Sequence, residues 1–215
     1  MPEYKQACLL AFTETWLDNH VQYSNWLIDG FANQLYLSEI NVSPGRTMED
    51  GYVFTLTRDG ATSLLIATLC TPEIELLSVS LCPFYLPRKF PHFFSTFVYI
   101  LPSANPARAT ELISRHINKL DSVSLDVPKF VLGGFNHCRV NSILKSFHQY
   151  VTCPTPRKRT IDLCYSSVPA AYSIVLTPTC SADNNGVQDG LKDLSGRWKS
   201  WQAGVPMVFC IAGLL

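Results

Sequence analysis

The chain has 215 residues, no net charge at pH 7, and 47% hydrophobic against 16% charged residues. This length suits one sizeable domain, or one domain with an appendage, and the apolar content excludes a disordered chain. The balanced charge excludes a strongly basic nucleic-acid binder, because such proteins carry an overall excess of Lys and Arg. Only the local clusters Arg88–Lys89 and 157–159 could attract a polyanion, and a solvated loop is the more ordinary explanation of each.

The sequence shows neither a targeting pattern nor a disulfide or zinc framework. Its N-terminal stretch lacks the pattern of a secretory signal, and no run reaches the roughly 18 apolar residues that span a bilayer. Eight cysteines occur without CxxC spacing and without a Cys/His set typical of zinc. Most stand in apolar runs such as ACLLAF and IDLCY, so we expect buried, reduced thiols. No cellular compartment is specified by these features.

In chain order, short apolar runs separated by turn residues predict a fold rich in strands. The spacing of apolar residues within 102–120 predicts a helix, with Asn105 as N-cap, Pro106 in the first turn and His116 packed beside the apolar stripe. RVNSILKSFHQY (139–150) predicts a second, shorter helix. Alternation of strands and helices indicates an α/β fold in which helices cover mixed sheets. The predicted strands are 7–13, 51–57, 63–69, 74–82, 93–101, 129–132, 160–167 and 171–177.

The segment KFVLGGFNHC (129–138) places polar side chains just beyond a predicted buried strand. We expect the glycine pair Gly133–Gly134 to end this strand, with Asn136 and His137 projecting from its tip. Ends of strands are where open α/β folds place ligand-binding and catalytic groups. A single carboxylate at such an end is more often a cap or a solvated residue. A set of oxygen ligands at the ends of separate strands is more suggestive, because Mg²⁺ prefers oxygen.

Six phrases, taken together, resemble the endonuclease/exonuclease/phosphatase superfamily, and within it the endonuclease domains of animal non-LTR retrotransposon reverse transcriptases. The phrases are FTETWL, PFYLPRKF, VYILPSAN, GGFNH, CPTPRKRTIDLCYSSVPAAY and SADNNGV, and they follow the family's order from about residue 7 to 187. The resemblance implies an α/β four-layer sandwich of two packed mixed β-sheets flanked by helices, as in deoxyribonuclease I. It implies a domain at 1–187, truncated before the family's first strand, and a divergent C-terminal tail at 188–215.

The same resemblance implies a Mg²⁺-dependent site that cleaves DNA phosphodiesters. Glu14 matches the family's metal-binding carboxylate, and Tyr99 matches the tyrosine that lies close to the scissile phosphate. Asn136 matches the asparagine that helps hold phosphate and nucleophile. Asp162 matches a site-supporting aspartate, and Asp183 matches the aspartate that orients a catalytic histidine.

Two further positions depart from the family pattern. Gly134 stands where the family has the aspartate that deprotonates the attacking water, and Asn184 stands where it has the charge-stabilising histidine. General-base catalysis typically contributes about 10²–10⁴-fold, and charge stabilisation is often larger. The resemblance therefore implies impaired catalysis, with Mg²⁺ binding weak or lost. His137, beside this tip, is expected to be structural and not a substitute base.

Three interpretations of the sequence stay open. The chain is a catalytically crippled nuclease fold, an active Mg²⁺-dependent endonuclease with a rebuilt site, or a non-enzymatic module that binds DNA or protein. A retained function would imply DNA as partner and a nuclear location, with no membrane association. The expected loss of the first strand predicts self-association through an unpaired sheet edge.

Overall fold

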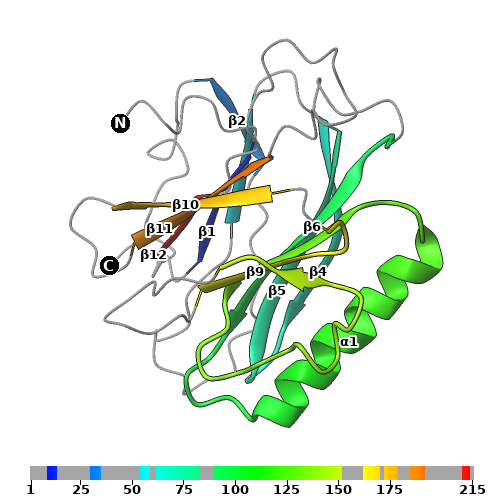
Figure 1. The fold of residues 1–215 in the computed structure, drawn as a ribbon, viewed down its shortest axis with the longest axis vertical. Coiled ribbons are helices and arrows are strands. Elements are labelled where there is room, and N and C mark those ends of the chain that lie inside the picture. The colour runs from blue at the N-terminus through cyan, green and yellow to red at the C-terminus, as the bar shows by residue number, and fades with distance from the viewer. Residues whose placement is uncertain are drawn as a thin grey trace.

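Two six-stranded sheets form the body of the protein (Figure 1). This computed structural model describes residues 9–13, 30–34, 54–58, 62–82, 90–151, 162–169, 172–178, 185–191 and 210–213. The first sheet has the spatial order β10 (Tyr172–Pro178), β11 (Asn185–Leu191), β12 (Cys210–Gly213), β1 (Leu9–Thr13), β3 (Phe54–Arg58) and β2 (Phe31–Gln34). The second has the order β4 (Thr62–Cys70), β5 (Ile74–Cys82), β6 (Phe93–Ile100), β7 (Lys129–Gly134), β9 (Asp162–Ser166) and β8 (His148–Gln149).

Both sheets are mixed, as the sequence predicted. In the described strands β1 runs parallel to β12 and β6 runs parallel to β7, whereas the other pairs are antiparallel. β1 lies between β12 and β3, so it is paired on both sides. The sheet edges among the described strands are β10, β2, β4 and β8.

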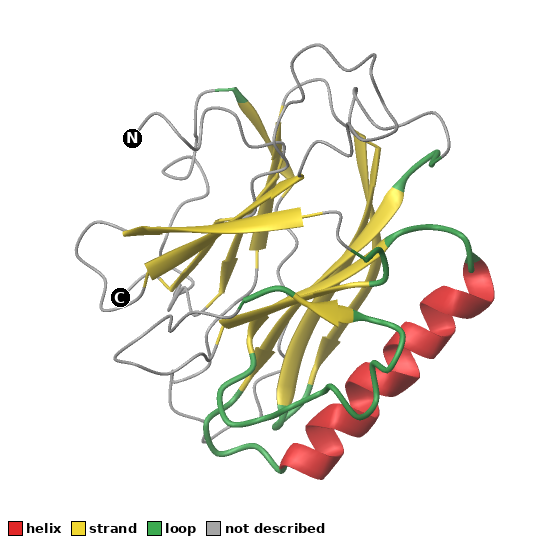
Figure 2. Cartoon of the chain, in the orientation of Figure 1, coloured by secondary structure: helices red, strands yellow, loops and turns green. Residues whose placement is uncertain are grey.

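The helix α1 (Pro106–Val123) connects the parallel strands β6 and β7 and lies along the second sheet (Figure 2). A parallel pair needs such a crossover. Asn105 caps its N-terminus as predicted, since its side chain accepts hydrogen bonds from the backbone N–H of Ala107 at 3.0 Å and of Arg108 at 3.3 Å. The buried face of the helix is the predicted apolar stripe, with His116 half-buried beside it: Ala109, Leu112, Ile113, Ile117 and Leu120.

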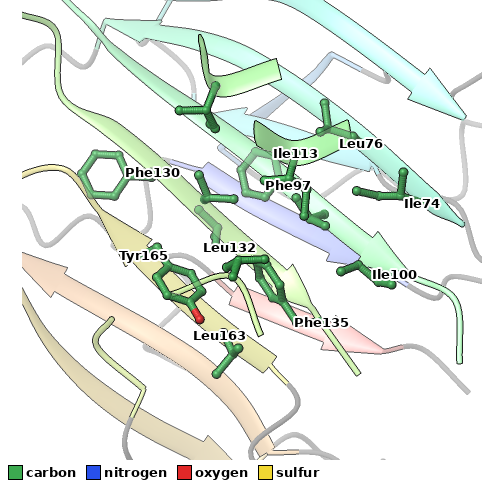
Figure 3. Close-up of a cluster of buried hydrophobic side chains, with 14 of the residues drawn as sticks. Ile74, Leu76, Phe97, Ile100, Ile113, Phe130, Leu132, Phe135, Leu163 and Tyr165 are labelled. Atoms are coloured by element: carbon green, nitrogen blue, oxygen red, sulfur yellow. The ribbon is translucent and has the colours of Figure 1, made fainter. Parts of the chain in front are cut away.

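A hydrophobic core holds the second sheet together (Figure 3). Phe93 of β6 meets Phe130 of β7 edge-to-face, with ring centroids 5.4 Å apart, and Phe135 meets Tyr165 of β9 in the same way at 5.5 Å. Such aromatic pairs add about 0.5–1.5 kcal/mol each beyond the area that they bury. These contacts fix β7 between β6 and β9, which is the part of the sheet that carries the candidate site.

The predicted second helix at 139–150 is wrong. Its backbone forms isolated turns, with Ile143 N–H donating to Val140 O at 3.0 Å and Phe147 N–H donating to Leu144 O at 3.0 Å. The segment then enters β8, which pairs with β9. A helix this short is marginal without tertiary support, and here the buried side chains of Val140 and Leu144 together with strand pairing determine the conformation.

Two further expectations concern the end of β7 and the domain boundary at residue 187. β7 does not end before the glycine pair but continues through Gly133 and Gly134, because both residues pair with strands on either side. The proposed domain boundary at residue 187 lies within β11, and β12, from the predicted tail, pairs with β1 and β11. The division into 1–187 and 188–215 stays a prediction.

The described cysteines carry thiols and form no disulfides with one another. Cys138 and Cys164 are buried as expected, but Cys82 is exposed, so the prediction of burial is wrong for it. Burial raises the pKa of the Cys138 thiol, which makes it a poor nucleophile.

Within the described ranges, no helix has the length and apolarity that crossing a membrane requires.

Candidate functional site

Three of the predicted site positions lie side by side across the second sheet. Tyr99 of β6 pairs with Gly134 of β7, and Gly134 pairs with Asp162 of β9. Paired residues on neighbouring strands lie on the same face of the sheet, and the strands are about 4.8 Å apart. The row lies where β6 and β7 end and β9 begins, so it occupies one end of the sheet. Parallel strands present ligand-binding groups at this carboxyl end.

The side chains of this row face away from α1. Ser78 and Thr96 point toward the helix, because Ser78 Oγ lies 2.6 Å from His116 Nε2 and 2.7 Å from Thr96 Oγ1. Tyr99 is three residues beyond Thr96 on the same strand, and side chains three apart in a strand point to opposite faces. Tyr99 is only 4% exposed and Asp162 only 8%. The row is therefore buried on the face of the second sheet opposite to the helix.

Gly133 and Gly134 have different reasons to be glycine. Gly133 has φ +136°, and a Cβ placed on it would lie 2.0 Å from the carbonyl oxygen of Val98. Only glycine fits there, because the parallel strand passes too close for any side chain. Gly134 does not have a positive φ. Its backbone suits any residue, so the middle of the row lacks a side chain without a conformational requirement for glycine.

Asn136 forms the tip beyond β7 and is fixed by its own side chain. Its φ of +49° lies in the left-handed region, which asparagine enters more readily than most residues. Its Nδ2 donates to the carbonyl oxygen of Ile100 at 2.5 Å, at the end of β6. Because a carbonyl only accepts, this contact fixes the orientation of the amide. The Oδ1 atom thus points away from Ile100, where it can accept a hydrogen bond or bind a cation.

His137 has the structural role that the sequence predicted. Its Nε2 lies 3.2 Å from the carbonyl oxygen of Ala104, in the turn between β6 and α1. Together, Asn136 and His137 hold the segment after β7 against the segment after β6. This ties the two strand ends that flank the candidate site.

The contact of His116 with Ser78 has the distance of a nucleophile–base pair but not its accessibility. Ser78 is completely buried between α1 and the sheet, so no substrate can reach its hydroxyl. Burial, helped by the charge of nearby Lys119, lowers the pKa of His116 to about 4. The ring is therefore neutral at pH 7, and the cluster is a packing contact between helix and sheet, as expected for His116.

Glu14, Asp183 and Asn184 lie outside the described residues. Glu14 follows the last residue of β1, and the other two directly precede β11. The described residues contain no group of three or more His, Cys, Asp or Glu side chains that could hold a metal ion. The assignment of Glu14 as the metal ligand therefore stays a prediction.

Sequence reasoning missed one buried carboxylate. Glu75, the second residue of β5, pairs directly with Tyr99 and is 2% exposed. It extends the row to Glu75–Tyr99–Gly134–Asp162. The signal was present in IELLSVSLC, where Glu75 is the one charged residue among the alternate positions that otherwise hold Leu77, Val79 and Leu81.

Comparison with known proteins supports the fold. No model of a known protein family matches the chain, and neither does the sequence of any curated protein. Solved structures do match. The mannosyl-6-phosphatase Bt3783 of Bacteroides thetaiotaomicron is 12% identical, with a TM-score of 0.63 over 90% of this chain and 88% of that one.

Two other structures agree with this match. Truncated TDP2 of Caenorhabditis elegans is 11% identical, with a TM-score of 0.60 over 86% of this chain and 85% of that one. An endonuclease/exonuclease/phosphatase family protein from Leptotrichia buccalis is 13% identical, with a TM-score of 0.53 over 89% and 90%. The chain thus has the fold of the endonuclease/exonuclease/phosphatase proteins, as its sequence phrases implied.

Proposed function

We propose that this chain is a retrotransposon-derived endonuclease-like domain of the class that cleaves DNA phosphodiesters with Mg²⁺, and that its catalysis is impaired. The observation that carries the proposal is the row Tyr99–Gly134–Asp162, in which the central position has no side chain. The fold and the ordered sequence phrases support the class. The missing groups at 134 and 184 support the impairment.

The residues of the row have distinct chemical capacities toward a phosphodiester. The Tyr99 phenol is a donor suited to a phosphate oxygen, and Asn136 Oδ1 is an acceptor suited to a water proton or a cation. Glu14 and Asn136 would hold Mg²⁺, which when bound would offset the negative charge of the phosphate. Asp162 supports the site from β9.

The chain lacks a side chain for one step of the reaction, which is the removal of a proton from the attacking water. As the water oxygen bonds to phosphorus and the O3′ leaving group departs, the water must lose a proton to a base. Gly134 offers none. Asn184 cannot carry the positive charge with which a protonated histidine would stabilise the phosphate. Binding of the substrate phosphate is therefore retained in this proposal while its hydrolysis is lost.

The proposal that phosphate binding is retained is tested by measuring how a fluorescent 20-base-pair DNA duplex binds at several salt concentrations. We expect weak binding that falls steeply with salt, because phosphate contacts release counterions. Tyr99→Phe and Asn136→Gly should each weaken it several-fold. The glycine variant removes the amide without straining the positive φ. Asn118→Ala, on the exposed face of α1, is the matched control and should bind as the unmodified chain does.

Absence of binding at low salt would contradict the proposal. Binding that is insensitive to both substitutions would instead favour a non-enzymatic module that contacts DNA elsewhere. Robust Mg²⁺-dependent cleavage of the duplex would favour an active enzyme with a rebuilt site.

A further inference from the structure

Glu75 is buried where packing alone would favour an apolar side chain. Its strand mates on the same face of β5, Leu77, Val79 and Leu81, are all buried and apolar. Placing an ionisable carboxyl among them costs several kcal/mol unless polar groups compensate, so leucine would be the simpler solution. A buried carboxyl near one end of a strand whose other side chains on the same face are apolar is a candidate for a functional role.

The strand register places Glu75 next to Tyr99. Glu75 lies on one side of Tyr99 and Gly134 on the other. Glu75 and Tyr99 are direct cross-strand partners on the face opposite to α1. Tyr99 therefore has a carboxyl neighbour on β5 and, on β7, Gly134, which has no side chain. Glu75 itself lies two strands from Gly134, or roughly 10 Å at a strand spacing of about 4.8 Å, which is too far to replace the missing base.

We infer that Glu75 is a positioning residue for Tyr99. Its carboxyl group fixes the tyrosine side chain from the β5 side, so that the phenol is directed toward the Gly134 side of the row, where a phosphate would bind. This inference rests on the proposed function for the role of Tyr99, but not for the cross-strand pairing of the two residues. Because Glu75 lies two strands from Gly134, with Tyr99 between them, it acts through Tyr99 and not on the substrate.

A double-mutant cycle tests this directly, because it isolates coupling between two residues. The four proteins are the unmodified chain, Glu75→Gln, Tyr99→Phe and the double variant. Each is measured for binding of the 20-base-pair duplex at low salt and for its urea unfolding midpoint. Glu75→Gln keeps the shape and removes the charge. Glu73→Gln, two residues earlier and more exposed, is the matched control.

If Glu75 positions Tyr99, Glu75→Gln weakens duplex binding about fivefold or more in the Tyr99 protein, the loss expected for roughly one hydrogen bond. It should have little effect in the Tyr99→Phe background. The unfolding midpoints should also be non-additive. Glu73→Gln should change neither quantity, and Glu75→Leu should retain the fold but bind as weakly as Tyr99→Phe.

Additive effects in both measurements would overturn the inference even if DNA binding itself is present. Non-additive unfolding midpoints with additive binding would also overturn it, because the contact would then serve stability alone. If the unmodified chain binds no duplex, the proposed function fails. The unfolding cycle then decides whether the two side chains interact, and additive midpoints there would overturn the inference as well.

Discussion

Gly133 and Gly134 are neighbours in β7 with opposite requirements for a side chain. At Gly133, the backbone of β6 occupies the space of a Cβ and φ is positive. At Gly134, φ is not positive, and the position is the centre of the Tyr99–Gly134–Asp162 row, where a side chain is missing. A glycine that its φ and its close neighbour require is thus adjacent to one whose φ does not require glycine. This distinction could not be drawn from the letters GG.

Substitution at the two glycines should therefore have very different effects on stability. Gly133→Ala should lower the free energy of unfolding by at least about 3 kcal/mol, from steric overlap with Val98 O and the positive φ. Gly134→Ala should change it by less than about 1 kcal/mol. Urea unfolding of both variants measures the difference. Equal destabilisation would contradict the register of β7 against β6.

His116 makes the packing of α1 sensitive to acid. Its ring is held near Ser78 and Thr96, and burial lowers its pKa from 6.5 to about 4. In the unfolded chain the ring gains a proton below about pH 6.5, whereas in the folded protein it does so only near pH 4. Proton uptake on unfolding therefore reduces stability as the pH falls between these values.

We expect the unmodified chain to lose up to about 3 kcal/mol between about pH 7 and about pH 4 through this group, since each pKa unit corresponds to about 1.4 kcal/mol. His116→Gln should reduce this loss, whereas His148→Gln, at an exposed histidine, should leave it unchanged. Urea unfolding at several pH values provides the measurement. If both variants show the same pH profile as the unmodified chain, the burial of His116 is not what sets this dependence.

At the level of elements, α1 is anchored to β7 through one buried lysine. Lys129, with its side chain 3% exposed, donates to the carbonyl oxygens of Ser124, Leu125 and Val127 at 2.8–3.1 Å. It also pairs with Asp121 Oδ1 at 2.9 Å. This charge satisfies backbone acceptors just beyond the C-terminus of the helix, where a cation is favourable.

Lys129→Met should destabilise the protein by about 3 kcal/mol, because it leaves Asp121 and the carbonyl groups without their cation. Lys119→Met, on the exposed face of α1, should cost less than about 0.5 kcal/mol. Thermal unfolding compares the two. A small effect at Lys129 would show that the loop after α1 relaxes to find other donors.

The elements that the sequence predicted are those with a strong local signal. α1 combines a cap, a proline and an apolar stripe, and β5 and β6 consist of long apolar runs. β2, β8 and β11 were missed because their residues, such as NGVQDGL, lack such a pattern. The apolar C-terminal run that contains β12 allowed a buried strand among other interpretations. Each of these four strands pairs with the strand next to it in the chain, and β12 also pairs with the distant β1. The segment 139–150 has a helical apolar spacing, but tertiary contacts override it.

Across the whole molecule, β4 is the longest edge strand among the strands that the structure describes. Its nine residues, TSLLIATLC, contain no charge and no proline, and Leu64 is 65% exposed. Edge strands usually carry charges or prolines that prevent pairing with another chain. The irregular register between Leu65 and Ala67 is the one protective device that the described strand has.

We expect self-association through this edge, in place of the unpaired strand that the sequence suggested. Leu64→Lys should shift the protein toward monomer at tens of micromolar in sedimentation velocity, because a charge on an edge strand opposes pairing with a second chain. Val123→Lys is the matched control, since it places the same charge at an exposed apolar residue at the end of α1, away from the sheet edge. A monodisperse monomer before any substitution would contradict the prediction.

The candidate site was only partly predictable. Tyr99, Gly134 and Asp162 were identified from sequence phrases, and the register aligns them in one row. Glu75 was not identified, because a single glutamate in an apolar strand has meaning only once its partner across the sheet is known. The orientation of the Asn136 amide likewise depends on a contact with β6 that no local pattern encodes.

The central claim, that this fold has lost its cleavage chemistry at positions 134 and 184, is tested most directly by nicking of supercoiled plasmid with Mg²⁺. The unmodified chain, Glu14→Ala and the Gly134→Asp/Asn184→His double variant are compared at equal concentration. We predict that the unmodified chain nicks no faster than Glu14→Ala, and that the double variant recovers little. Robust nicking by the unmodified chain that Glu14→Ala abolishes would contradict the claim.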